Sequence, residues 1–351
     1  ALKLAMPIAV LSAMRESSGY HISVKGGRFL EAVAQADTVV FDKTGTLTHA
    51  MPTVAKIVPF GGHDEAEMLR LAACLEEHYP HSMANAVVEE AKRRGLHHEE
   101  RHAKVEYLVA HGIASSVDGE QVRIGSAHFI FEDGKCVIPE EERAKFDALP
   151  PEYSQLYLAI NGVLSPVICI SDPLREEARE VLSALRALGV RNAVMLTGDS
   201  PRTAAAIAEQ LGVDAFRAGV LPADKAEYVA ALRKEGHTVL MVGDGINDSP
   251  ALSEADAGIA ISDGAAIARE IADITIAADS LWELVRLRQL AMALMRRIRN
   301  NYRFVIGFNG ALIGLGVTGI LPPTTSAMLH NLSTLGVSLH SMTALPQKKQ
   351  D

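Results

Sequence analysis

Three acidic motifs of this sequence each lie directly after a short apolar run. DKTGTLT begins at Asp42, TGD begins at Thr197, and GDGINDSPAL begins at Gly243. If the apolar runs are parallel strands, the motifs meet where the carboxyl ends of the strands form the ligand-binding edge of a sheet. A carboxylate at a strand end, beside backbone N–H groups that can face an oxyanion, is suited to attack a phosphoryl group and form an aspartyl phosphate.

Asp42 is the predicted nucleophile of this set, and Gly45 in the same motif allows close approach of the backbone. Lys225, in LPADK, offers a cation to the phosphoryl oxygens, and Thr197 offers a hydroxyl. The carboxylates of GDGINDSPAL, at positions 244 and 248, are hard oxygen ligands of the kind that Mg²⁺ prefers. Such a metal would neutralise charge on the nucleophile and on the phosphoryl group during in-line transfer.

The pattern that must position these residues is that of an α/β protein. Apolar runs that alternate with amphipathic helices predict a parallel sheet covered on both faces. The expected strands are TVVF at 38–41, VICI at 167–170, AVML at 193–196, TVLMV at 238–242, AGIAI at 257–261 and ITI at 274–276. We expect this sheet domain over 23–50 and 166–284, with an inserted α+β module over 51–165, because structureless connections of that length are rare.

Composition excludes several classes of protein. The 351 residues are 48% hydrophobic, which rules out a disordered chain, and 34 Lys+Arg against 43 Asp+Glu give a net charge of −9. An acidic chain argues against nucleic acid as a partner. The three cysteines are widely spaced and match neither a disulfide framework nor a zinc site.

The C-terminal region has no Asp, Glu, Lys or Arg over residues 304–342. It is long enough for two membrane helices, which we expect over 304–322 and 324–342, after a basic linker helix at 285–303 and before a cytoplasmic tail at 343–351. The arginines before the first span and the lysines after the second place both flanks on the cytoplasmic side. Residues 1–22 are expected to be the end of a further membrane helix with its cytoplasmic extension. For residues 304–342 the alternative is a buried helical hairpin of a soluble protein.

Polar side chains inside such a hairpin are candidates for binding a transported ion. They are Asn309, His330, Asn331, Ser333 and Thr334. An imidazole with amide and hydroxyl oxygens suits a borderline cation such as Zn²⁺, Co²⁺, Ni²⁺ or Cu²⁺. Hydrogen bonding between the helices is the alternative role.

DKTGTLT, TGD and GDGINDSPAL together resemble the phosphorylation domain of P-type ATPases, a haloacid-dehalogenase-like fold with an inserted nucleotide-binding domain. The resemblance implies that ATP phosphorylates Asp42 and that Mg²⁺ lies with Asp42, the backbone of Thr44, and Asp244. It places Asp172 and Arg175 at the hinge side where the insertion returns, beside the nucleotide. The remaining residues that the motifs contribute to the catalytic set are Lys43, Gly198, Asp199 and Asn247.

Thr44 distinguishes this reading from a phosphatase of the same superfamily. Phosphatases usually carry an acid/base Asp two positions after the nucleophile, and threonine cannot serve that role. A membrane-tethered Mg²⁺-dependent phosphatase is nevertheless the alternative function, and a nucleotide-sensing module without chemistry is a third.

The start of the chain, ALKLAMP, resembles the ALGLATP segment of heavy-metal-transporting P-type ATPases. The resemblance implies a nucleotide site at Glu76, His81, Gly112 and Gly125. Two residues depart from the subfamily pattern: Ser82 replaces a proline and Ala110 replaces a glycine. The histidines of HHEERH at 97–102 are expected in a solvated loop.

The chain is therefore expected to be a C-terminal part of a heavy-metal pump that lacks its actuator domain and first membrane helices. Its expected cofactors are ATP and Mg²⁺. Its expected partners are a heavy-metal cation such as Cu, Zn, Co or Ni, the lipid bilayer and the N-terminal part of the same pump. The expected location is the bacterial plasma membrane, with the catalytic domains in the cytoplasm.

Overall fold

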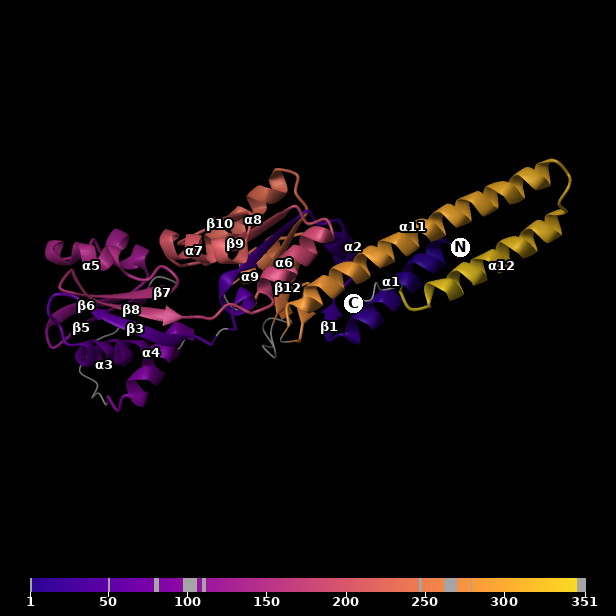
Figure 1. Cartoon of the computed structure of the whole chain (residues 1–351). Coiled ribbons are helices and arrows are strands. Elements are labelled where there is room, and N and C mark those ends of the chain that lie inside the picture. Colours follow the sequence, from indigo (N-terminus) through magenta and orange to yellow (C-terminus); the bar gives the residue numbers. More distant parts are fainter. Residues whose placement is uncertain are drawn as a thin grey trace. The chain divides into compact units, whose positions relative to one another are not determined.

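The computed structural model describes residues 2–49, 51–78, 82–96, 106–108, 112–245, 248–261, 270–278 and 280–345. Two compact units contain them (Figure 1). The first comprises Ala1–Val39, Ser183–Arg191 and Val229–Asp351, and the second comprises Val40–Leu182 and Asn192–Tyr228.

The second unit contains a six-stranded antiparallel sheet. Its order is β3 (Thr53–Pro59), β8 (Val163–Ser171), β7 (Ser154–Ile160), β6 (Glu120–Gly125), β5 (Gly112–Val117) and β4 (Glu106–Leu108). β3 and β8 are the strands by which the chain enters and leaves this sheet. They pair directly, with Thr53 opposite Ser171, so the two ends of the inserted segment lie side by side.

Alternating side chains of this sheet enter two apolar layers, as the period of a strand requires. Ile57 packs in the layer under α3 (Glu65–Glu76) and α4 (Ser82–Arg93), whereas its neighbour Val58 packs with Phe60 and Phe129 in the other layer. The second layer also carries the short helices η2 (His128–Asp133), η3 (Glu140–Glu142) and α5 (Arg143–Asp147). The Asp64 carboxylate caps α3 by accepting from the N–H groups of Ala66 and Glu67.

The remainder of the second unit belongs to the parallel α/β part of the chain. β2 (Thr38–Asp42), β9 (Asn192–Leu196) and β10 (Ala215–Arg217) follow one another in the sheet, and β9 and β10 are parallel. α7 (Pro201–Leu211) starts at a Ser200 cap that accepts from the Thr203 N–H, and it ends at Gly212 with φ 71°. α6 (Ala178–Ala187) and α8 (Pro222–Lys234) begin in this unit, and their C-terminal parts, from Ser183 and from Val229, belong to the first unit.

The first unit carries four strands in the order β1 (Ile22–Val24), β13 (Ile274–Ile276), β12 (Ala257–Ile261) and β11 (Val239–Gly243). The last three are parallel, and β1 is antiparallel to β13. Every residue of β11, β12 and β13 is buried, which explains why these strands read as continuous apolar runs. α2 (Gly27–Gln35) and α9 (Ser249–Glu254) are the short helices of this unit.

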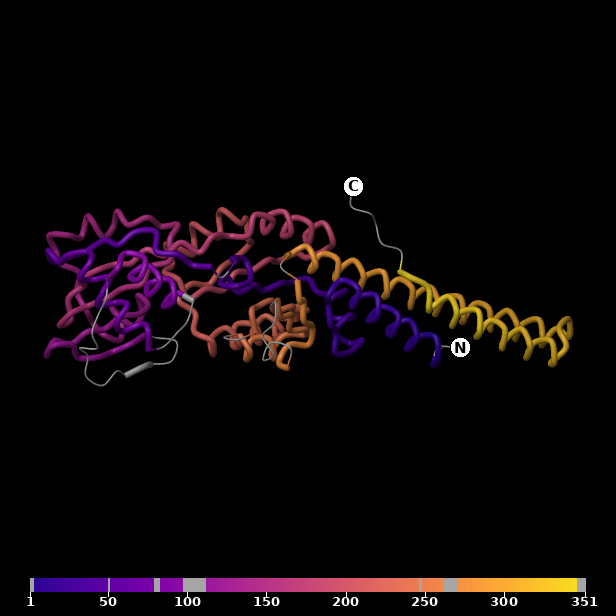
Figure 2. Tube along the Cα trace, turned by 90° about the horizontal axis from the view of Figure 1, so that it is seen from below, coloured from indigo at the N-terminus to yellow at the C-terminus, as the bar shows by residue number. Residues whose placement is uncertain are grey.

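Three long helices complete the first unit: α1 (Leu2–Ser18), α11 (Trp282–Val317) and α12 (Pro323–Ser341). Both views of the trace show α1 beside the base of the α11–α12 hairpin (Figure 2), where the Leu345 N–H donates to Glu16. Arg288 of α11 is buried and donates to the carbonyls of Val33 and Leu188, which lie just at the ends of α2 and α6. A cation at helix C-termini is favourable because the exposed carbonyls there carry partial negative charge.

Two expectations about the elements were wrong. VICI at 167–170 lies in β8, in the antiparallel sheet, because an apolar run buried on both faces does not by itself specify which sheet it joins. The basic linker at 285–303 and the apolar run after it form one helix, α11, since nothing between Trp282 and Val317 breaks the helical hydrogen bonding.

The two membrane spans predicted over 304–322 and 324–342 are not confirmed. Among the described residues, no helix combines the length and apolar character that crossing a membrane requires.

Candidate active site

Asp42 ends β2, a strand whose five residues are all buried, and its side chain is almost enclosed. The loop Lys43–Leu47 that follows turns sharply at Gly45, which has φ 74°. Thr48 closes the loop: its hydroxyl accepts from the Gly45 N–H at 3.0 Å, and its own N–H donates to the Lys43 carbonyl at 3.2 Å. DKTGTLT is thus the end of β2, as predicted, followed by a loop that Thr48 closes.

Lys225 forms an ion pair with the predicted nucleophile. Its Nζ lies 2.6 Å from Asp42 Oδ1, and both side chains are only 9% exposed. Lys225 comes from the first turn of α8, 183 residues further along the chain. A buried carboxylate needs such a partner, and the same ammonium group is placed to meet negative charge that arrives at Asp42.

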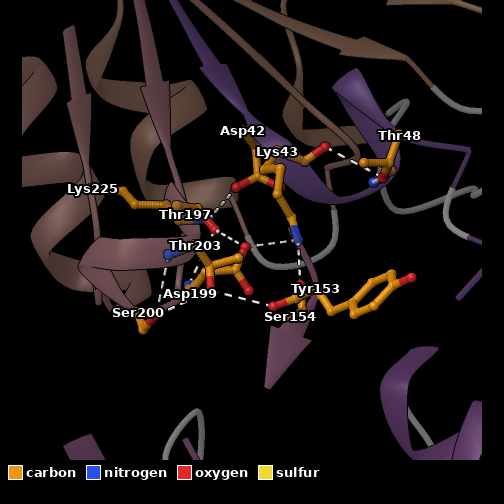
Figure 3. A network of polar contacts seen from close by, with 11 residues as sticks. Asp42, Lys43, Thr48, Tyr153, Ser154, Thr197, Asp199, Ser200, Thr203 and Lys225 are labelled. Atoms are coloured by element: carbon orange, nitrogen blue, oxygen red, sulfur yellow. Dashed lines mark hydrogen bonds and ion pairs between the residues drawn. The ribbon is translucent and has the colours of Figure 1, made fainter. Parts of the chain in front are cut away.

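A second buried ion pair lies beside the first (Figure 3). Lys43 Nζ is 2.8 Å from Asp199 Oδ2 and donates to Ser154 Oγ at 2.9 Å. The Thr197 hydroxyl donates to the same Asp199 oxygen at 2.9 Å and accepts from the Asp199 N–H at 3.1 Å. The TGD motif therefore folds on itself and presents one carboxylate to Lys43.

The charges of this pair determine its ionisation. Burial alone would lower the pKa of Lys43, but the Asp199 carboxylate and the neighbouring acids raise it above its ordinary value. Burial alone would raise the pKa of Asp199, but the charge and hydrogen bond of Lys43 lower it. Both groups are therefore ionised at neutral pH.

Asp172 and Arg175 lie on the segment that follows β8. The Nε of Arg175 donates to the Thr46 carbonyl at 3.0 Å, and the backbone N–H of Arg175 donates to the Leu47 carbonyl at 2.9 Å. Arg175 therefore holds the loop after Asp42. Burial raises the pKa of Asp172, whose carboxylate faces Lys43 and is hydrogen-bonded by Thr48. Both residues follow the end of β8 at Ser171.

Three of the residues predicted to bind a nucleotide are described by the structure, and they lie in the part of the second unit that contains the six-stranded sheet. Glu76 ends α3 and is buried, and Gly112 begins β5 directly opposite Gly125 of β6. A Cβ at Gly112 would lie 2.4 Å from the Ile124 carbonyl, and φ there is 156°, so the close approach of these strands requires glycine. His81 and Ala110 lie outside the described residues.

The predicted magnesium ligands are divided between the units. Asp42 and Thr44 belong to the second unit, and Asp244 and Asp248 belong to the first, at the carboxyl end of β11. Asp248 is buried against Gly243, where a Cβ would come within 2.5 Å of the carboxylate. Asn247 lies outside the described residues, and within the part of the chain that is described no three His, Cys, Asp or Glu side chains cluster as a metal site.

The hairpin residues are only partly brought together. His330 Nδ1 lies 2.9 Å from Asn309 Oδ1, which joins α12 to α11. The hydroxyls of Ser333 and Thr334 donate to the His330 carbonyl of their own helix, at 2.8 and 3.0 Å, and Asn331 is exposed. The arrangement matches the alternative of hydrogen bonding between helices for the first pair.

Ser154 is the residue of this region that the sequence did not indicate. It begins β7, is buried, and touches both members of the Lys43–Asp199 pair. No motif surrounds it, and its partner Lys43 is 111 residues away. Only the fold could have identified it.

Known proteins resemble the chain over nearly its full length. A zinc-exporting P-type ATPase from Mycobacterium marinum is 39% identical over 352 residues, with 97% of this chain and 47% of the relative covered. A manganese-exporting P-type ATPase from Mycobacterium leprae is 39% identical over 344 residues, with the same coverage, and a probable copper-exporting P-type ATPase V from Mycobacterium tuberculosis is 36% identical over 350 residues, with 97% and 44% covered. The chain spans about half the length of these relatives.

Solved structures of P-type ATPases also resemble the chain. A zinc-transporting PIB-type ATPase in the E2.Pi state matches with a TM-score of 0.68 and 35% identity, over 97% of this chain and 55% of that one. The catalytic CPx-ATPase domain CopB-B matches with a TM-score of 0.59 and 25% identity, over 78% of this chain and 98% of that one. The model of the haloacid dehalogenase-like hydrolases matches residues 36–256, more than half of the chain. The chain therefore belongs to the haloacid dehalogenase-like hydrolases, and its relatives within that family are heavy-metal P-type ATPases.

Proposed function

We propose that this chain carries the ATP-dependent phosphorylation machinery of a heavy-metal-exporting P-type ATPase. The observation that supports this most directly is the buried Asp42–Lys225 pair at 2.6 Å, with the Lys43–Asp199 pair beside it. This arrangement combines a strand-end carboxylate nucleophile with the Lys225 ammonium group, which can meet phosphoryl charge, and with a second ion pair that holds the loop after the nucleophile.

In the proposed reaction a carboxylate oxygen of Asp42 forms a bond to the γ-phosphorus of ATP. The bond from that phosphorus to the β,γ-bridging oxygen breaks, and ADP leaves with the electron pair. Lys225 and the Thr197 hydroxyl stabilise negative charge on the transferring group. The arrangement of Lys43 on Asp199 keeps the loop after the nucleophile in place.

The residues present fit a magnesium ion. Asp42 and the Thr44 carbonyl in the second unit, and Asp244 and Asp248 in the first, are all hard oxygen donors of the kind that Mg²⁺ prefers, and each is a proposed ligand. Bound Mg²⁺ supplies neutralisation of the phosphoryl charge. The proposed nucleotide-binding residues are Glu76, His81, Gly112 and Gly125.

Thr44 favours a phosphoenzyme that persists, since its side chain cannot act as the acid/base that hydrolyses the intermediate in phosphatases. A persistent covalent state suits a pump, because a domain must move while the phosphate is bound. A Mg²⁺-dependent phosphatase is the second candidate function. The observation that supports it is the match of residues 36–256 to the haloacid dehalogenase-like hydrolases.

The proposed substrate is a heavy-metal cation, as in the relatives that export zinc, manganese or copper. Asn309 and His330 are the proposed contact points for it within the α11–α12 hairpin, because they present an amide oxygen and an imidazole to each other. Transport requires the remaining part of the pump as a partner, and a membrane location with cytoplasmic catalytic units follows from the same proposal.

The test is incubation of the chain with γ-labelled ATP and Mg²⁺. We expect an acid-stable, hydroxylamine-labile phosphoprotein that Asp42→Asn abolishes. Rapid release of inorganic phosphate without a trapped intermediate would assign the phosphatase function instead. ATP binding with no label on Asp42 would contradict both and leave a nucleotide-sensing module.

A further inference from the structure

We propose that Ser154 is a positioning residue that couples the six-stranded sheet to the phosphoryl-acceptor loop, Lys43–Leu47, which follows Asp42. Phosphoryl transfer from ATP to Asp42 then depends on Ser154, whereas phosphoryl transfer from a small donor does not. This inference rests on the proposed function, in which the six-stranded sheet presents the nucleotide to Asp42.

Ser154 is the first residue of β7 and is buried, with 4% of its surface exposed. The hydroxyl oxygen accepts a hydrogen bond from Lys43 Nζ at 2.9 Å, and the hydroxyl is hydrogen-bonded to the Asp199 carboxylate (Figure 3). One hydroxyl thus satisfies both members of the buried ion pair. Lys43 is the residue directly after the nucleophile, so the first residue of β7 is linked to Asp42 through a single side chain.

Two further contacts hold the same stretch of chain to the TGD side of the site. Thr203 Oγ1, in α7, donates to the Tyr153 carbonyl at 3.2 Å, and Arg202 Nη1 donates to the Asp147 carbonyl at 2.6 Å. The segment 147–154, which leads into β7, is therefore fixed at three points. Of these, the Ser154 contact is the one that reaches a residue adjacent to Asp42.

Loss of the hydroxyl would leave the Lys43–Asp199 pair in place, because that pair has its own contact of 2.8 Å. The acceptor loop would keep its shape through Gly45, Thr48 and Arg175. What disappears is the hydrogen bond between Lys43 of that loop and the first residue of β7. A donor delivered by the sheet should therefore react more slowly, whereas a donor that diffuses directly to Asp42 should not.

The experiment compares ATP with acetyl phosphate as the phosphoryl donor, each at saturating concentration with Mg²⁺. For Ser154→Ala we expect the rate of ATP labelling to fall about tenfold, the effect of a hydrogen bond to a charged group, with the rate from acetyl phosphate unchanged. Ser154→Thr keeps the hydroxyl in a strand position and should restore most of the ATP rate. Labelling from acetyl phosphate also shows that each variant is folded.

Ser165→Ala is the matched control. Ser165 is a buried serine of β8 whose hydroxyl donates to the Val163 carbonyl and makes no contact with the site. Thr203→Val provides a second variant, because it removes the Tyr153 contact at nearly constant volume and should slow ATP labelling selectively as well.

An equal loss with both donors would overturn the inference, since Ser154 would then act only on the chemistry or on stability. Unchanged labelling from ATP would overturn it as well. If the unaltered chain takes label on Asp42 from neither donor, the proposed function itself fails, and that outcome is distinct from the other two.

Discussion

At the scale of single residues, the site is organised as two buried ion pairs with different tasks. Lys225 contacts Asp42, the proposed nucleophile, while Lys43 contacts Asp199 of the TGD motif. The first pair therefore bears on the charge of the reaction, and the second on the geometry of the loop. Substitutions should separate these tasks.

Replacing Lys225 by glutamine removes the cation nearest to Asp42. We expect the rate of Asp42 labelling by ATP to fall about 100-fold to 1,000-fold, the range found when one group that stabilises developing charge is removed. Lys234→Gln, on the exposed last turn of the same helix, is the control. Labelling of Lys225→Gln at the rate of this control would contradict the assigned role.

Asp172 gives a prediction about pH. Burial raises its pKa above the ordinary value of 3.8, so the folded state holds the proton more tightly than the unfolded state and the charged form costs stability. This cost is absent below pH 3.8 and appears as the pH rises through the folded pKa. Asp172→Asn should therefore raise Tm at pH 7, and the gain should shrink as the pH approaches 3.8.

Thermal unfolding between pH 4 and pH 7 measures this effect. The exposed Asp147, changed to asparagine, serves as the comparison because its side chain is 65% exposed. A gain in Tm that is independent of pH would show that the substitution acts through packing rather than through charge.

At the scale of the elements, the pairing of β5 with β6 depends on a glycine. A methyl group at Gly112 would lie 2.4 Å from the Ile124 carbonyl and 2.5 Å from Phe129, so the two strands must separate to admit it. We expect Gly112→Ala to destabilise the chain by about 1–3 kcal/mol, the cost of overpacking, and to weaken ATP binding.

Gly119→Ala separates the steric part of this effect from the backbone part. Gly119 has φ 87° but no neighbour within 4 Å of an added Cβ, so its substitution carries only the cost of the dihedral angle. Urea unfolding and titration with ATP measure both variants. Equal destabilisation by the two would show that the crowding at Gly112 is unimportant.

The sequence predicted the local parts of this arrangement and missed the remote ones. Asp42 ends the apolar strand β2, and Thr197 and Asp199 follow the apolar strand β9, so the apolar runs alone were enough to predict that these residues lie at strand ends. Ser154 could not be identified, because its role arises from a contact across 111 residues. VICI at 167–170 was assigned to the wrong sheet because burial on both faces erases the alternation that would have marked an antiparallel strand.

At the scale of the whole molecule, the α11–α12 hairpin presents apolar side chains outward. In α12 these are Met328, Leu332, Leu335 and Leu339, each more than half exposed and spaced so that they form one stripe. A stripe of this kind marks an interaction surface, and lipid is the partner that the proposed function provides. The predicted boundary at residue 303, between the basic helix and the first apolar helix, was wrong. It was placed where the charged residues stop, whereas α11 continues through this point.

We therefore expect the full chain to float with phosphatidylglycerol vesicles in a density gradient. Leu332→Glu combined with Leu335→Glu should release most of it, because charge on the stripe opposes burial in lipid. Val137→Glu, an exposed apolar residue of the second unit, is the control. Flotation that is the same for all three proteins would exclude the stripe as the contact.

The pairing of β3 with β8 has a consequence for how such a chain can be rebuilt. Thr53 lies opposite Ser171, and on the other side of this junction Thr48 bridges to Leu174 while the His49 N–H donates to the Pro173 carbonyl at 3.4 Å. Excision of residues 53–171 would therefore leave two cut ends already adjacent, which a linker of a few residues can rejoin at little cost in chain entropy. We therefore expect that residues 53–171 can be produced as a separate protein and that the rest of the chain can fold without them.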